Sequence, residues 1–162
     1  MRLLALCPRI RKSDGCIVAT TAWRMSAVSV GTIYRKVVID PQSSHLVVAS
    51  RYLWFISRSR EIPFSRIQAV TYGYEDTSID FSYSHDSFDW FTVGLRLTDE
   101  TELHLFNFIG DGTFSNSGPL PDWLYWDEFA FDLSGSQEKE SRVFVDLLSK
   151  MVGVKVVPPR PY

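Results

Sequence analysis

The chain has 162 residues, of which 45% are hydrophobic, 14% aromatic and 22% charged. This length suits a single domain with a sizeable core, and the composition excludes disorder over most of the chain. Two cysteines, Cys7 and Cys16, provide no disulfide framework, so a reducing cytoplasm is the simplest setting. The apolar run before Pro8 is too short for a signal-peptide core. No later run approaches the roughly 18 apolar residues that a membrane span requires.

The formal net charge of −2 hides an asymmetry between the two halves of the chain. Residues 1–66 carry eleven Lys and Arg against three acidic residues, whereas residues 67–162 carry six against sixteen. Two interpretations stay open. The halves neutralise each other within one fold, or the basic half faces an anionic partner. The order of the strands decides between them.

The first third of the chain divides into an unpatterned and a patterned part. Residues 1–30 show no sustained periodicity, which indicates a loosely structured N-terminal extension, and Met25 would serve as a start just before the patterned region. Residues 31–157 are predicted to form a single domain, followed by a tail at 158–162. The first predicted strand covers about residues 33–39 and ends at a cluster of turn-forming residues, 40–44.

The densest run of strand-forming residues lies between positions 51 and 70. Aromatic and branched side chains at 52–56 predict a strand that is buried on at least one face. The polar residues at 57–60 predict a hairpin turn that contains Arg58 and Arg60. The strand that returns over 60–65 contains Pro63, which lacks a ladder donor and is therefore expected at a sheet edge.

The second half of the chain contains the clearest periodic signals. Strict alternation over 91–97 predicts a strand, with a returning strand over 102–108 and an aromatic insertion at 110–136. A C-terminal helix is predicted over 137–153, with Ser134 or Ser136 as its N-cap and Gly153 as its stop. The spacing i, i+3, i+4 and i+7 places one apolar stripe on this helix: Phe144, Leu147, Leu148 and Met151.

About seven antiparallel strands followed by one amphipathic helix resemble the bacterial pleckstrin-homology-like (PH-like) domain family. In that family an I-P-F-x-x-I segment recurs in the first half of the domain, and here it is Ile62, Pro63, Phe64 and Ile67. The resemblance covers about residues 32–108 and the helix. It implies a mainly β fold, a half-open antiparallel barrel capped by the C-terminal helix, that acts as a binding or scaffolding module and is often associated with membranes. The loop at 40–44 lacks the Lys and Arg with which eukaryotic members hold inositol phosphates, so that site is not carried over.

The basic residues near the predicted hairpin are the candidate contacts for an anion or an anionic lipid: Arg51, Arg58, Arg60 and Arg66. The alternative is a solvated turn that blunts the end of a sheet. Two arginines contribute about 2 kcal/mol near an anionic membrane, whereas even millimolar binding corresponds to about 4 kcal/mol. Further contacts are therefore needed.

The aromatic insertion supplies the candidate protein-interaction residues: Trp123, Tyr125, Trp126 and Phe129. Aromatic side chains concentrate in interaction hot spots and in membrane interfaces. The acidic residues interspersed among them favour a protein partner over an anionic membrane. The alternative is that the insertion folds back over the barrel and fills its open side.

No motif for catalysis, a metal or a cofactor is present. His45, His85 and His104 lie far apart and lack neighbouring ligands at metal-site spacing, and no nucleic-acid-binding module is visible. The leading hypothesis is a cytoplasmic, non-enzymatic PH-like module that binds a protein partner or self-associates. The second is peripheral binding to anionic lipid at the inner face of the membrane through the basic hairpin. The third is a small enzyme with a pocket under the aromatic insertion.

Overall fold

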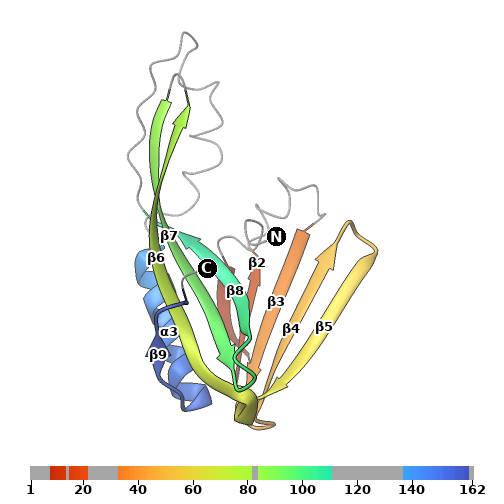
Figure 1. Cartoon of the computed structure of the whole chain (residues 1–162). Coiled ribbons are helices and arrows are strands. Elements are labelled where there is room, and N and C mark those ends of the chain that lie inside the picture. The colour runs from red at the N-terminus through yellow and green to blue at the C-terminus, as the bar shows by residue number, and fades with distance from the viewer. Residues whose placement is uncertain (1–7, 14, 22–32, 82–83, 111–136, 161–162) are drawn as a thin grey trace.

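The computed structural model describes residues 8–13, 15–21, 33–81, 84–110 and 137–160, with residues 33, 76–81 and 84–88 described by their backbone alone. These residues form two sheets and one α-helix (Figure 1). Sheet 1 has the order β1-β2-β3-β4-β5, all antiparallel: Pro8–Ser13, Cys16–Thr21, Ile33–Asp40, His45–Tyr52 and Ile56–Pro63. Sheet 2 has the order β8-β7-β6-β9: Glu102–Ile109, Ser84–Leu97, Ile67–Phe81 and Val156–Val157.

The predicted class, mainly β with one helix near the C-terminus, is confirmed. The described residues contain nine strands rather than about seven, and the two sheets do not close into a barrel. A single 3-10 turn, η1 (Phe64–Arg66), joins β5 to β6. From this junction the sheets diverge, so that the β4–β5 connection and the long β6–β7 hairpin point away from the body as separate projections (Figure 1).

The expectation of a loose N-terminal extension is wrong for residues 8–13 and 16–21. They form the hairpin β1–β2, and β2 pairs with β3 through four residue pairs, from Ile17 opposite Ile39 to Thr20 opposite Lys36. Ile17 and Ala19 are buried in the core. The sequence pattern missed these strands because only alternate residues of the short β2 face the core, and small residues such as Ala19 carry a weak hydrophobic signal.

The core is formed by the facing sides of the two sheets and by the helix α3 (Glu138–Val152). Phe144 of the helix packs against Phe106 and Phe108 of β8, with ring centroids 6.2 and 6.0 Å apart. The Tyr72 hydroxyl lies 2.8 Å from that of Ser141. Within the predicted apolar stripe, Phe144 and Leu148 are fully buried, while Leu147 and Met151 are half-buried.

The helix ends where the sequence predicts and begins with a different cap. Gly153 is the C-cap in the left-handed region, with φ 78°, which confirms the predicted stop. The N-cap is Gln137, without a side-chain capping bond, rather than Ser134 or Ser136. The amide of Gln137 donates to the carbonyl of Ile109, so the end of β8, rather than a local serine, positions the first turn.

The charge asymmetry of the sequence becomes a difference between the sheets. The strands of sheet 1 carry eight Lys and Arg against two acidic residues, whereas those of sheet 2 carry one Arg against six acidic residues. Among the described residues, the ion pair between Arg66 and Asp99, at 3.0 Å, is the one that joins the two halves of the chain. In the described part of the chain, no Lys or Arg of a sheet 1 strand forms an ion pair with an acidic residue of a sheet 2 strand.

Asp99 provides a pH-dependent contact in the β7–β8 turn. Hydrogen bonds from the hydroxyl and amide of Thr101, assisted by the charge of Arg66, lower the pKa of this carboxyl below its ordinary value. A lowered pKa in the folded state stabilises the fold above the unfolded value of about 3.9, and this stabilisation is lost as the pH falls through the folded value.

We therefore expect Asp99→Asn to lower the urea midpoint at pH 7 and pH 5. The difference from the wild type should shrink as the pH falls below 4. Urea titrations at pH 7, 5 and 3 check this. A gap that stays constant down to pH 3 would show that the ionised carboxylate is not its source.

Candidate functional site

The connection between β4 and β5 exposes a continuous apolar tip. Tyr52 pairs with Ile56, and the three residues between them form the turn. Leu53, Trp54 and Phe55 are 52, 59 and 77% exposed, and Ile56 is 40% exposed. The tip lies at the free end of sheet 1, at the upper right in Figure 1. Four consecutive large apolar residues at the end of a projection form a surface that soluble proteins usually bury or use for contact.

The backbone of this tip is also unusual. Leu53 and Trp54 both have positive φ angles, 51 and 62°. Turn positions with positive φ normally contain Gly or Asn, because a larger side chain in the left-handed region costs of order 1–3 kcal/mol. Leu and Trp therefore destabilise this turn both through the backbone and through their exposure to water. Such residues at a strained position are typical of a site of function.

The predicted position of the turn is wrong. Residues 52–56 were expected to form a strand and residues 57–60 the turn, whereas the turn is Leu53–Phe55 and residues 57–60 belong to β5. The reason is the register of the pair. Leu46 lies opposite Ile62 and Val48 opposite Arg60, so the inward positions of β4 and the buried Ile62 set the alignment. Their midpoint falls at Trp54.

The four candidate arginines are not gathered in one turn. Arg51 lies on the outer face of β4, with its guanidinium carbon 5.4 Å from the centre of the Tyr34 ring. Arg58 lies opposite Ser50 on the inward side of the edge strand β5, two positions beyond Ile56, and is exposed. These two flank the apolar tip from opposite faces. Arg60 lies farther along β5, and Arg66 lies in η1 at the other end of the sheet, paired with Asp99.

The four candidate protein-interaction residues of the insertion lie outside the described residues: Trp123, Tyr125, Trp126 and Phe129.

Arg35 is a structurally central residue that sequence reasoning missed. It lies on the inward side of β3 and reaches across to β8 of sheet 2, where Nη1 donates to the carbonyl oxygens of His104 and Leu105, both at 2.9 Å. Its Nε donates to the Ser50 hydroxyl at 3.2 Å, and Nη2 donates to the Tyr52 hydroxyl at 3.3 Å. This guanidinium therefore links the end of β4 in sheet 1 to the edge strand β8 of sheet 2 through hydrogen bonds. The sequence feature that could have indicated this role is a charged residue at a position that faces the core, two residues before Val37.

Tyr52 connects this cluster to the apolar tip. Burial raises the pKa of Tyr52, but hydrogen bonds with Arg35 and Ser50 and the charges of Arg35 and Arg58 outweigh it and leave the pKa below its ordinary value. The residue immediately before Leu53 is thus anchored to the core of the molecule by its hydroxyl.

The described residues show neither a metal site nor a membrane-spanning helix. No group of three His, Cys, Asp or Glu there is placed to hold a metal ion. No helix in the described part of the chain has both the length and the apolar composition to cross a membrane. No family model, curated protein or solved structure matches this chain. The geometry of the β4–β5 tip therefore carries the functional argument.

Proposed function

We propose that this protein is a non-enzymatic, PH-like binding module that docks on anionic membrane surfaces through its β4–β5 hairpin. The observation that carries the proposal is the exposed apolar tip, Leu53–Ile56, flanked by Arg51 and Arg58. Apolar side chains enter the boundary between headgroups and acyl chains, while arginines bind lipid phosphates. The PH-like assignment is supported by the element order and by the I-P-F-x-x-I segment at Ile62–Ile67.

The energies of the tip are sufficient for weak, reversible binding. Burying a whole side chain of this kind contributes about 1.5–3 kcal/mol, so the exposed portions of Leu53, Trp54 and Phe55 contribute roughly 3–4 kcal/mol together. Arg51 and Arg58 add about 2 kcal/mol near an anionic surface. The total of roughly 5–6 kcal/mol exceeds the about 4 kcal/mol of millimolar binding. The two arginines alone, at about 2 kcal/mol, would not give millimolar binding.

The distribution of charge favours an anionic surface as the partner. The tip extends from sheet 1, which carries the excess of Lys and Arg, and diverges from the β6–β7 hairpin of the acidic sheet 2 (Figure 1). A membrane that meets the tip is thus approached by the positive side of the molecule. The hypothesis of a protein partner or of self-association was based on the aromatic insertion and on an exposed barrel edge, and the residues of the insertion lie outside the described part of the chain.

Vesicle co-sedimentation of the full chain tests the proposal, with neutral and anionic vesicles at low and at physiological salt. We expect binding to anionic vesicles only, weaker at higher salt because the charges are screened. The triple variant Leu53→Ser/Trp54→Ser/Phe55→Ser should bind at least tenfold more weakly at either salt concentration. Arg51→Ala/Arg58→Ala should bind about thirtyfold more weakly, which corresponds to about 2 kcal/mol.

Two control variants on α3 match these changes. Val143→Ser removes an exposed apolar side chain, and Lys139→Ala/Lys150→Ala removes two exposed charges. Both should bind like the wild type. Equal binding to neutral and anionic vesicles, or a triple-serine variant that binds normally, would contradict the proposal. Absence of binding under all four conditions would also contradict the proposal and would favour a protein partner.

A further inference from the structure

The face of sheet 2 opposite α3 has glycine and threonine side by side on its two central strands. Thr71 of β6 lies opposite Gly94 of β7, and Gly73 lies opposite Thr92. A Cβ at Gly94 would lie 2.8 Å from the carbonyl oxygen of Leu103 and 2.7 Å from the Thr71 hydroxyl, so the sheet itself requires glycine there.

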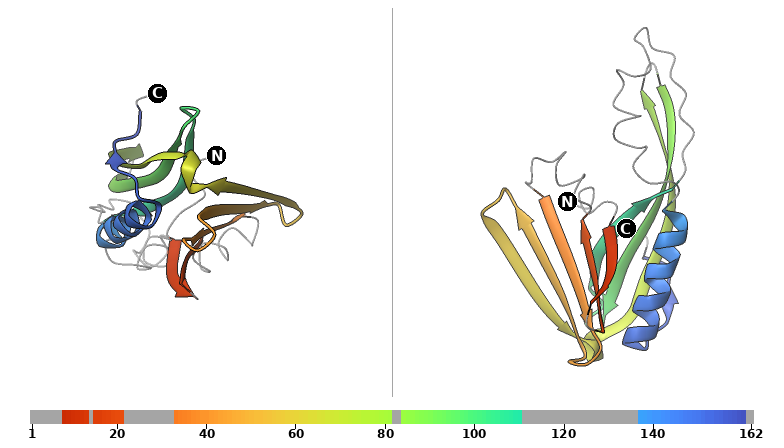
Figure 2. Two further views of the ribbon diagram at one scale, coloured as in Figure 1. Left: turned by 90° about the horizontal axis from the view of Figure 1, so that it is seen from below. Right: turned by 180° about the vertical axis from the view of Figure 1, so that it is seen from behind.

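Gly73 meets a different neighbour. The three atoms nearest to a Cβ at this position all belong to Pro159, at 2.7, 3.1 and 4.0 Å. The space left by the missing side chain is therefore filled by a proline ring from the C-terminal segment. That segment runs along the face of sheet 2 opposite α3 (Figure 2, left). Glycine at position 73 matters for this contact rather than for the sheet.

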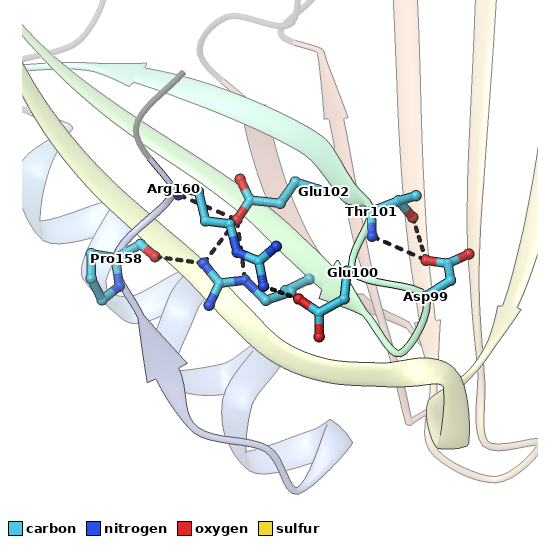
Figure 3. Close-up of polar contacts among 7 residues, drawn as sticks. Asp99, Glu100, Thr101, Glu102, Pro158 and Arg160 are labelled. Carbon is cyan, nitrogen blue, oxygen red and sulfur yellow. Dashed lines mark hydrogen bonds and ion pairs between the residues drawn. The ribbon is translucent and has the colours of Figure 1, made fainter.

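The C-terminal segment is held on this face at several points (Figure 3). Val156 and Val157 form β9, a two-residue parallel strand beside β6. Arg96 donates to the carbonyl oxygen of Pro158 at 3.0 Å and to Glu102 at 2.8 Å. The guanidinium of Arg160 forms an ion pair with Glu100, and its amide donates to the Glu102 carboxylate at 3.3 Å.

The groove extends beyond the segment that occupies it. A cavity of about 300 Å³ lies beside Pro159 and Arg160, bordered by the Gly and Thr floor and by Glu75, Glu102 and His104. Its charged side chains apart from Arg160 are acidic. The groove thus combines a flat floor that receives a proline ring, an exposed edge that pairs with extended backbone, and a rim that binds arginine. These three features match an extended segment of the sequence Val-Pro-Pro-Arg, which prolines stiffen before binding.

We infer that this face of sheet 2 is a peptide-docking groove for extended Val-Pro-Pro-Arg segments. Residues 156–160 occupy it within the same molecule, and it accepts the same segment from a second copy of this chain. The intramolecular segment competes at an effective concentration in the millimolar range. The groove is separate from the β4–β5 tip, so the inference stands or falls independently of membrane binding.

Binding of a labelled peptide covering residues 155–162 to the full chain tests the inference, with fluorescence anisotropy as the readout. The variant Arg160→Glu loses the ion pair to Glu100 and leaves the groove intact. We expect it to bind the peptide at least tenfold more tightly than the wild type, whose own segment blocks the groove. Adding Gly73→Ala to this variant should abolish binding, because the new Cβ takes the space of the proline ring.

Limited trypsin digestion provides a second readout that needs no peptide. The bond after Lys155 is the cleavage site, and it should be cut faster in Gly73→Ala and in Arg160→Glu than in the wild type, since both variants release the segment. Asp146→Asn, a charge change on the exposed side of α3 that adds no trypsin site, is the control and should match the wild type in both assays.

The following results would overturn the inference. An Arg160→Glu protein that binds the peptide no more tightly than the wild type overturns the inference and makes the segment a fixed structural strap. Binding that survives Gly73→Ala overturns it as well. If the double variant fails to fold, binding of a peptide that carries Pro159→Asp to the Arg160→Glu protein is measured instead. Undiminished binding of that peptide would contradict the proposed groove.

Discussion

Replacing Ala19 with aspartate is expected to lower the free energy of unfolding by about 4 kcal/mol or more, because it places a carboxylate without a partner in the core. Ala19 is fully buried in β2, beside Ile17 and opposite Val37 of β3. Since small domains are stable by only about 5–15 kcal/mol, the variant should be largely unfolded or insoluble. Urea titration followed by circular dichroism measures the change.

Two companion variants show whether β2 belongs to the core. Thr20→Asp, one residue along on the outer face and opposite Lys36, is the matched control and should change stability by less than about 1 kcal/mol. Deletion of residues 1–24 removes β1 and β2 together and should prevent folding. A soluble protein of residues 25–162 that unfolds at the wild-type urea concentration would refute the placement of these strands.

Arg35→Ala is expected to lower the free energy of unfolding by about 2–4 kcal/mol. The substitution leaves the partly buried carbonyl oxygens of His104 and Leu105 without the guanidinium that they share, and an unsatisfied polar group removed from water costs about 1–3 kcal/mol. It also removes the hydrogen bond from Arg35 to the Tyr52 hydroxyl at the base of the apolar tip. Urea titration of the variant and of the wild type at pH 7 measures the loss.

Lys36→Ala is the matched control, because Lys36 neighbours Arg35 on the opposite face of β3 and should contribute less than about 0.5 kcal/mol. Arg35→Lys separates charge from geometry. A lysine keeps the charge but cannot bridge several acceptors with a planar fork, so it should recover little of the lost stability. Full recovery by lysine, or equal effects of the changes at 35 and 36, would contradict the assigned role.

The sequence determined the elements whose pattern is strong and local. Alternation over 91–97 predicted the second half of β7, the apolar stripe Phe144, Leu147, Leu148 and Met151 predicted α3, and Gly153 predicted the end of the helix. These predictions hold because period two, period 3.6 and a left-handed C-cap are properties of adjacent residues. The sequence also showed that the two halves of the chain differ in charge.

Only the tertiary structure decided where those elements and charges act. The turn at Leu53–Phe55 follows from the alignment of Leu46 with Ile62, which depends on a shared core rather than on the local preference of an aromatic run for a strand. The short pattern of β2 can be recognised as a strand only beside β3, with which it pairs. The role of Gly73 likewise depends on contact with Pro159, which is distant in the sequence. Contacts between residues distant in the sequence set all three, and no local pattern encodes them.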